Sequence, residues 1–124
     1  KALQSFLEGK ERFDFVLLGM GEDGHTASLF PGTDAIIEKD DWVKAVYVKK
    51  LDAWRLTLTS PILNRSQQVV FMISGKSKAP ALKEVLEGAY QPNEYPAQII
   101  QPKDGRLTWM IDRAAATMLS SNYS

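Results

Sequence analysis

Two short apolar runs, residues 13–18 and 69–73, dominate the hydrophobic pattern of the chain. Both are rich in β-branched and aromatic residues, and Asp14 is the one polar interruption. Near-continuous apolar runs of this length are typical of strands buried on both faces of a parallel sheet, whereas half-buried strands alternate apolar and polar residues. The pattern therefore predicts an α/β fold in which a mostly parallel sheet has flanking helices.

Further elements are predicted around these two runs. Residues 42–48 and 54–59 predict two more strands, and the sequence leaves open whether they pair with each other or continue one sheet. The serine-proline pair at 60–61 predicts a short helix, with serine at the N-cap and proline at the first helical position. The turn at 74–78, which contains Gly75, predicts the start of a second helix, which ends at Gly88. The backbone amides of this turn and the helix dipole predict an anion site.

Both ends of the chain also predict helices. Apolar residues within 3–7 share a helical face with no N-cap before them, so the chain is expected to begin inside a helix. Near the other end, residues 97–101 and 107–111 predict strands, with a tight turn of hairpin type at 104–105 between them. Asp112 is predicted to cap a final helix with an apolar face within 114–119.

The most distinctive stretch follows the first apolar run, where three glycines stand within six residues. Gly19, Gly21 and Gly24 allow the backbone to turn sharply and a ligand to approach the main chain closely. Asp23 and His25, the one histidine of the chain, lie in the same loop. Because open α/β sheets place their sites beyond the carboxyl ends of the strands, this glycine loop, residues 19–25, is the predicted site.

Residues 19–24 also fit the G-x-G-x-x-G fingerprint of dinucleotide-binding loops. That fingerprint must open a long helix whose N-terminus faces the pyrophosphate, yet residues 30–32, Phe-Pro-Gly, would end a helix within about two turns. Glu22 and Asp23 would also place two carboxylates beside the pyrophosphate. The spacing fits a dinucleotide loop, but the charges and the helix break do not.

An aspartate two residues before a histidine suits proton transfer. If the Asp23 carboxylate, or a backbone carbonyl, orients the imidazole of His25, the other ring nitrogen is available as a general base near neutral pH. The alternative is a buried, hydrogen-bonded histidine that only closes the loop. The glycine-rich strand end and the adjacent acid favour the catalytic interpretation.

Composition narrows the classes of partner and cofactor. Fifteen basic and fifteen acidic residues cancel within 124 residues, one domain's worth of chain, so no overall charge favours nucleic acid or an anionic membrane. No apolar run approaches the roughly 20 residues that span a bilayer. Because the chain has no cysteine and one histidine, we expect no disulfide, no metal and no cofactor. This composition is compatible with a cytoplasmic location.

The glycine loop closely resembles a family signature, since residues 17–32 read LLGMGEDGHTASLFPG, as in the 6-phosphogluconolactonases, relatives of the glucosamine-6-phosphate deaminase/isomerases. Further matches follow in the family's order: Arg55 to Thr59, Ser74-Gly75 before Lys78-Ala79, Tyr95-Pro96-Ala97, and Asp104-Gly105 with Trp109 and Asp112. The resemblance implies a Rossmann-like fold, with residues 1–124 as the C-terminal part of a larger single domain. The N-terminal half, which in the family carries another phosphate loop and arginine, is expected to be absent, and this portion to be inactive by itself.

The resemblance implies hydrolysis of 6-phospho-D-glucono-1,5-lactone to 6-phosphogluconate, in the oxidative pentose phosphate pathway. His25 would be the general base that activates water, Asp23 would orient it, and amides of the glycine loop would stabilise the oxyanion, with Gly19, Gly21 and Gly24 as substrate-binding positions. Arg55 and Lys78 would hold the substrate phosphate. From the residues themselves, a lone arginine in a strand is more often a solvated edge residue, and the lysines could equally be solvated. Lys76 has no matched role, and the oligomeric state stays open.

Two alternatives draw on the same residues. The deaminase/isomerases share the G-x-D-G-H core but need a glutamate five residues after the histidine, and Phe30 occupies that position here. Phenylalanine cannot transfer a proton, so the lactonase interpretation is preferred. A non-catalytic sugar-phosphate binding module would use the same anion-binding residues and would bind without turnover. For Trp109 and Asp112, packing and capping are the preferred roles.

Overall fold

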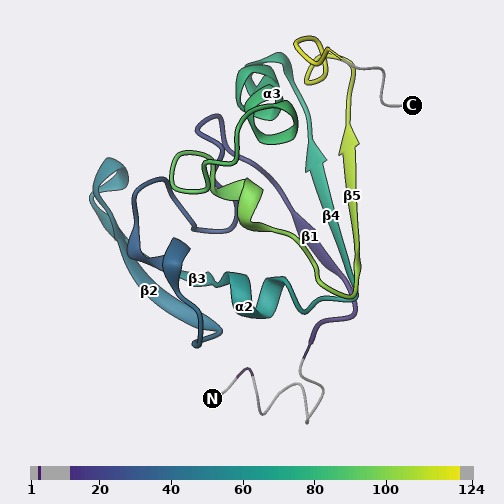
Figure 1. Cartoon of the computed structure of the whole chain (residues 1–124). Helices are drawn as coiled ribbons and strands as arrows, with labels where there is room; N and C mark the ends of the chain where they lie inside the picture. Colours follow the sequence, from purple (N-terminus) through teal and green to yellow (C-terminus); the bar gives the residue numbers. More distant parts are fainter. Residues whose placement is uncertain (1–2, 4–11, 121–124) are drawn as a thin grey trace.

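The computed structural model describes residue 3 and residues 12–120 (Figure 1). Its strands are β1 (Val16–Leu18), β2 (Val43–Val48), β3 (Ala53–Leu58), β4 (Gln68–Ile73) and β5 (Arg106–Ile111). Its α-helices are α2 (Ser60–Leu63) and α3 (Ala79–Glu87), and its 3-10 helices are η1 (Asp34–Ile37), η2 (Lys49–Leu51), η3 (Lys76–Lys78) and η4 (Pro96–Ile99). The predicted N-terminal helix lies, apart from Leu3, outside the described residues. None of the described helices has the length and apolar character needed to cross a membrane.

The α/β prediction is confirmed by a parallel sheet of three strands in the order β1-β4-β5. The central strand β4 is the second predicted run, and Val69, Val70, Phe71 and Ile73 in it are buried. On the inner face the Phe71 ring stacks on Trp109 of β5, with ring centroids 4.1 Å apart, so Trp109 has the packing role expected of it.

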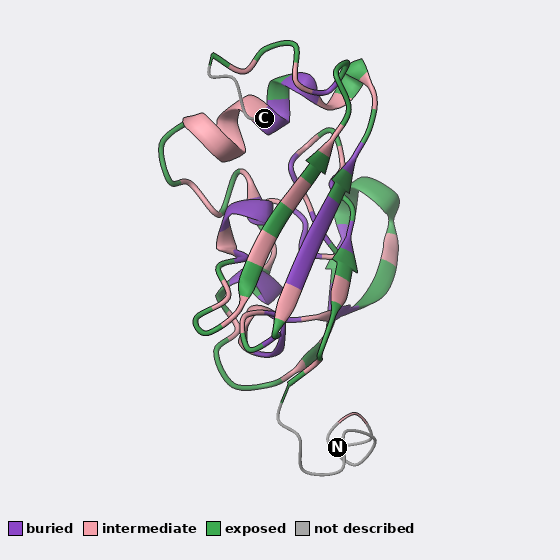
Figure 2. Ribbon diagram, turned by 90° about the vertical axis from the view of Figure 1, so that its right-hand side faces the viewer, coloured by how far each residue is buried: buried purple, intermediate pink, exposed green. Residues whose placement is uncertain are grey.

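The first predicted run, 13–18, forms a shorter and less buried strand than expected. β1 covers Val16–Leu18, and the side chains of Phe15 and Leu17 are 53% and 56% exposed. The prediction of burial on both faces is therefore wrong for this run in the described part of the chain. The helices lie on one face of the sheet, while the other face, with Met72 and Met110 also exposed, points outward (Figure 2).

The pairing that the sequence left open is resolved as an antiparallel hairpin. β2 and β3 form a separate two-stranded sheet, with Val46 opposite Arg55 and Tyr47 opposite Trp54. The hairpin lies on the same side of the parallel sheet as the helices (Figures 1 and 2). It is joined to the segment after the glycine loop, because the amide of Ser28 donates a hydrogen bond to the Thr57 hydroxyl at 3.1 Å.

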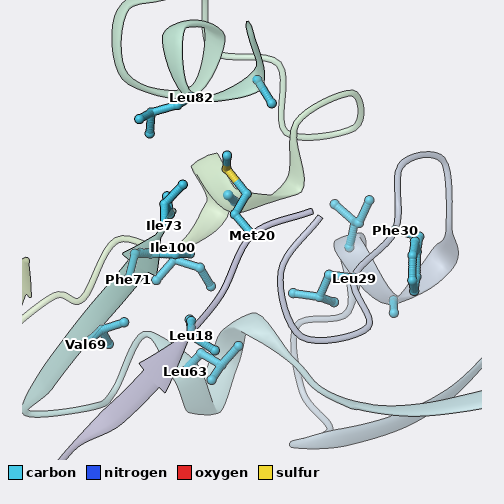
Figure 3. Close-up of a cluster of buried hydrophobic side chains, with 14 of the residues drawn as sticks. Leu18, Met20, Leu29, Phe30, Leu63, Val69, Phe71, Ile73, Leu82 and Ile100 are labelled. Carbon is cyan, nitrogen blue, oxygen red and sulfur yellow. The ribbon is translucent and has the colours of Figure 1, made fainter. Parts of the chain in front are cut away.

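The helices that follow strands agree with the predictions except at one cap. α2 begins at Ser60, so Thr59 instead of Ser60 occupies the N-cap position. α3 ends before Gly88 as expected, and it is preceded by the single 3-10 turn η3. Buried side chains from α2, α3, the parallel sheet and the glycine loop meet in one core (Figure 3). Leu63, Leu82, Phe71 and Met20 represent these four parts.

Residues 97–101 do not form the predicted strand. Residues 96–99 form η4, and the buried Gln98 side chain donates to the carbonyls of Glu84 at 3.1 Å and Ala89 at 2.9 Å, at the end of α3. These side-chain hydrogen bonds satisfy backbone groups locally, and a strand ladder would not supply them. The hairpin prediction at 104–105 is also wrong, because β5 runs parallel to β4.

The predicted final helix is replaced by a series of turns over residues 113–118. Asp112 nevertheless caps the first turn as expected, since its carboxylate accepts the Ala115 amide at 2.8 Å. The same carboxylate also accepts hydrogen bonds from the loop after β4. Asp112 therefore joins two chain segments, a task that the local helix pattern did not reveal.

Candidate active site

The glycine loop leaves the carboxyl end of β1 and folds back on itself. The Gly21 amide donates to the His25 carbonyl at 2.9 Å, and the Gly24 amide donates to the Gly21 carbonyl at 3.0 Å. The Thr26 hydroxyl closes the loop by donating to the Gly19 carbonyl at 2.8 Å. These hydrogen bonds bring His25 back beside the end of the strand, where the sequence predicted a site.

Two of the three glycines are required by contacts in this loop. A Cβ atom at Gly21 would lie 2.1 Å from Cε1 of His25, so the imidazole packs directly on the bare backbone. Gly24 has a φ of +81°, and a Cβ there would lie 2.9 Å from a ring carbon of Tyr95. Gly19 meets no atom within 4 Å in the same test, so the structure gives it no steric reason.

Asp23 and His25 form a directed pair. Oδ1 of Asp23 lies 2.5 Å from Nδ1 of His25 and also accepts the His25 backbone amide at 3.1 Å. Because Nδ1 faces the carboxylate, Nε2 is the ring nitrogen left for a substrate or water. The Phe30 ring stacks on the imidazole with centroids 4.2 Å apart, and Phe30 itself is 8% exposed. The ring is therefore held from its edge and from one face.

The second oxygen of Asp23 binds a lysine that the sequence analysis missed. Nζ of Lys50 lies 2.9 Å from Oδ2, and the carboxyl side chain is 22% exposed. Burial raises the pKa of Asp23, but hydrogen bonds from Lys50 and His25 outweigh burial and lower it to about 2. Lys50 sits in η2 at the tip of the β2–β3 hairpin. The position of Lys50 beside Asp23 could be found only once β2 and β3 were known to pair.

Lys78 reaches the same place from η3, which follows the neighbouring strand β4. Its ammonium group donates a hydrogen bond to the Met20 carbonyl at 2.5 Å. A hollow of about 440 Å³ lies between these elements. The residues that line it are Leu17, Leu18, Gly19, Met20, Gly21, His25, Thr26, Ala27 and Lys78. The structure thus combines the predicted base with one of the two predicted phosphate ligands.

Arg55 is not among the residues that line this hollow. It lies opposite Val46 in the hairpin and shares the inner face of the hairpin with Thr57, which contacts Ser28. Its side chain is exposed, and within residues 12–120 no hydrogen bond or ion pair of Arg55 is recorded. Its phosphate-binding role stays a prediction. Lys76, for which no role was predicted, is exposed in η3.

The turn after β4 was expected to bind an anion through its backbone amides, and its anion is a carboxylate of the chain itself. The Gly75 amide lies 3.2 Å from both oxygens of Asp112, and the Ser74 hydroxyl donates to Oδ2 at 2.7 Å. Hydrogen bonds from the Ala115 amide, from Ser74 and from Gly75 lower the pKa of Asp112. Of the predicted phosphate-binding turn, Lys78 is the part that reaches the hollow.

Among the described residues, no group of three or more histidine, aspartate or glutamate side chains is arranged to hold a metal ion. The polar lining of the hollow beside His25 consists of the His25 imidazole, the Lys78 ammonium group, the Thr26 hydroxyl and backbone atoms. This set can accept a proton and attract an anion. It resembles the lining of a hydrolytic site that uses water and a general base.

Comparisons with known proteins agree with the family resemblance seen in the sequence. The family model described as Glucosamine-6-phosphate isomerases/6-phosphogluconolactonase matches residues 1–109. The 6-phosphogluconolactonase of Synechocystis sp. is 45% identical over 108 residues, which cover 86% of this chain and 43% of that protein. The 6-phosphogluconolactonase of Rattus norvegicus is 44% identical over 109 residues, which cover 87% of this chain and 42% of that protein. The chain therefore spans less than half the length of these curated relatives.

Solved structures agree with the fold. A 6-phosphogluconolactonase from Trypanosoma cruzi superposes with a TM-score of 0.76 at 29% identity, over 89% of this chain and 42% of that one. A monomeric glucosamine-6-phosphate deaminase superposes with a TM-score of 0.71 at 27% identity, over 94% of this chain and 52% of that one. The fold is thus similar to that of proteins with either activity. The fold does not distinguish lactone hydrolysis from deamination, and only the residues of the site can do so.

Proposed function

Because the chain belongs to the glucosamine-6-phosphate isomerase/6-phosphogluconolactonase family, we propose that it serves the hydrolysis of 6-phospho-D-glucono-1,5-lactone to 6-phosphogluconate. The observation that carries the proposal is the Asp23–His25 pair, which leaves Nε2 of the imidazole for water at the carboxyl end of β1. The reaction belongs to the oxidative pentose phosphate pathway, and we propose a cytoplasmic location. Residues 1–124 would supply the C-terminal part of the catalytic domain.

In the proposed mechanism, Nε2 of His25 takes a proton from water as the water oxygen forms a bond to the lactone carbonyl carbon. The bond from that carbon to the ring oxygen then breaks, and the imidazolium returns the proton to the ring oxygen. Asp23 holds Nδ1 and stabilises the imidazolium between these steps. His25 is thereby regenerated, water and the lactone are consumed, and the second water proton stays on the new carboxylic acid, which ionises at neutral pH.

The oxyanion that develops on the carbonyl needs hydrogen-bond donors. The amides of Gly21 and Gly24 donate to carbonyls of the loop itself, so in this arrangement they are not available as the donors expected of the glycine loop. Other amides of the glycine loop would have to serve. Lys78 is proposed to anchor the substrate phosphate at the hollow, with Arg55 as its partner from the hairpin, and this anchoring would position the reacting carbon.

Phe30 supports lactone hydrolysis over deamination of glucosamine 6-phosphate. The deamination requires an additional acid for opening the sugar ring, and the resemblance places that acid at residue 30. Here the position holds a buried ring that stacks on His25 and has no proton to transfer. The same stacking fits a site in which His25 is the one proton-transfer group.

The test is the rate of lactone hydrolysis by the intact protein that carries this sequence, corrected for spontaneous hydrolysis. His25→Ala should lower kcat at least about a hundredfold, the usual contribution of a general base, with little change in affinity for 6-phosphogluconate. Lys76→Ala is the matched control and should keep the wild-type rate. A wild-type rate equal to background, with 6-phosphogluconate still bound, would instead indicate a binding module. Release of ammonia from glucosamine 6-phosphate would indicate the deaminase activity.

A further inference from the structure

The tip of the β2–β3 hairpin is an ordered turn that presents a lysine to the glycine loop. η2 fills the tip, and the Asp52 amide donates to the Lys49 carbonyl at 3.1 Å. Asp52 has a φ of 47°, and its carboxylate accepts a hydrogen bond from the Tyr47 hydroxyl. The closed turn places the backbone of Lys50, and the side chain, which is 64% exposed, extends from there to the Asp23 carboxylate.

Lys50 completes the set of contacts around the Asp23 carboxylate. Oδ1 accepts both the backbone amide and Nδ1 of His25, while Oδ2 accepts the Lys50 ammonium group at 2.9 Å. An ion pair between two mobile surface side chains contributes little. Here Asp23 is already fixed by the His25 backbone, so the lysine meets a carboxylate whose orientation has been prepared.

We propose that Lys50 is a positioning residue that acts on His25 through Asp23, by sharing the negative charge of the carboxylate that holds Nδ1. The catalytic meaning of this inference rests on the proposed function. Its structural content, an effect of a hairpin residue on the ionisation of a histidine 25 positions away, does not.

The expected direction follows from the charges that face the imidazole. They are the Asp23 carboxylate at Nδ1, the Lys50 ammonium group behind that carboxylate, and Lys78, which lines the same hollow. Lys50 and a protonated His25 compete for one carboxylate. Removal of the lysine leaves the full negative charge to the imidazolium, which becomes easier to form, so His25 should hold its proton to a higher pH.

The experiment is an NMR titration of the intact protein that carries this sequence, in which the ring resonances of His25 are identified by their loss in His25→Ala. In Lys50→Met the midpoint of the His25 titration should rise by about half a pH unit, as expected for loss of a unit charge several ångströms away in a largely aqueous setting. Lys50→Arg should restore most of the wild-type midpoint. Lys49→Met, on the same tip, should leave the midpoint unchanged.

A second pair of variants tests whether the effect passes through Asp23. In the background of Asp23→Asn, Lys50→Met should shift the midpoint by less than half as much as it does in the wild type. Far-ultraviolet circular dichroism shows that each variant is folded, and Lys50→Gln replaces Lys50→Met if the latter is not. In the intact protein, the acidic limb of the pH profile of kcat/KM should shift to higher pH by the same amount as the NMR midpoint.

A Lys50→Met midpoint that equals the wild-type value, or lies below it, would overturn the proposal. So would an equal shift in Lys49→Met, because the effect would then belong to the net charge of the hairpin tip. Failure of the proposed function has a different signature, namely a wild-type protein without lactonase activity in which the NMR shift of Lys50→Met is still present.

Discussion

Two loops of this molecule follow neighbouring parallel strands, and both were predicted as binding turns because of their glycines. The glycine loop follows β1, and residues 74–78 follow β4, to which β1 is paired. Each loop contacts a carboxylate that accepts backbone and side-chain hydrogen bonds. In the first, Asp23 comes from the loop and holds the base; in the second, Asp112 comes from the end of β5 and occupies the turn.

The difference shows what a glycine turn at a strand end does and does not determine. In each loop one backbone amide donates to a carboxylate, that of His25 to Asp23 and that of Gly75 to Asp112. Whether that anion is a ligand or a protein side chain depends on what the adjacent strand delivers. β5 delivers a carboxylate to the second turn, whereas the hollow beside the first loop is lined by a cation, Lys78, and a neutral carbonyl.

The largest expected effect is that of Gly21→Ala in the first loop. The new methyl group would lie within 2.2 Å of two atoms of the His25 ring, so the imidazole has to leave its position against the backbone. We expect kcat to fall at least about a hundredfold and the free energy of unfolding to fall by about 2 kcal/mol. Both are measured on the same preparation, by lactone hydrolysis and by urea denaturation.

The control for this change is Gly19→Ala, judged by stability. A methyl group there would meet no atom within 4 Å, so the free energy of unfolding should change by less than about 1 kcal/mol. Equal losses of stability in the two variants would show that the packing of His25 on Gly21 does not determine the conformation of the glycine loop.

A smaller effect is expected at the second loop from Asp112→Ala. The change removes an acceptor for Ser74, Gly75 and Ala115, so the midpoint of thermal unfolding should fall at neutral pH. Because the pKa of Asp112 is lowered in the folded chain, its contribution is present above the ordinary carboxyl pKa and disappears in acid. Wild type and variant should therefore converge as the pH falls below the ordinary carboxyl pKa of 3.8 and through the lowered pKa of Asp112.

The same variant sharpens the comparison between the loops. With the carboxylate gone, the turn after β4 regains free amides, and inorganic phosphate should raise the thermal midpoint of Asp112→Ala more than that of the wild type. Asp104→Ala, which removes an exposed carboxylate before the opposite end of β5, serves as the matched variant and should respond to phosphate like the wild type. An equal phosphate response in all three proteins would argue against occupation of the turn by Asp112.

How far the sequence could predict this structure depends on how local each cause is. The Asp23–His25 pair was predicted because its partners are two residues apart. The central strand β4 was predicted because residues 69–73 are all apolar, although Met72 on its outward face is exposed. Lys50 was missed because it meets Asp23 across 27 residues, and the outward face of β1 was misjudged because burial depends on what covers a strand. The strand predicted at 97–101 was wrong for a similar reason, because the Gln98 side chain forms hydrogen bonds with the end of α3.

The smallest effect concerns acid stability and separates the two carboxylates by their consequences. The pKa of Asp23 is about 2 in the folded chain against an ordinary value of 3.8, so its contribution to stability is present above pH 3.8 and is lost as the pH falls through about 2. Asp23→Asn and Asp112→Asn should each flatten the fall in stability across this range, as followed by urea denaturation at successive pH values. The variants should differ in the NMR titration of His25, which moves to lower pH in Asp23→Asn because the imidazolium loses its partner, and stays in place in Asp112→Asn. An unchanged titration in Asp23→Asn would mean that the carboxylate does not stabilise the imidazolium, and the distinction between the two loops would then be one of shape alone.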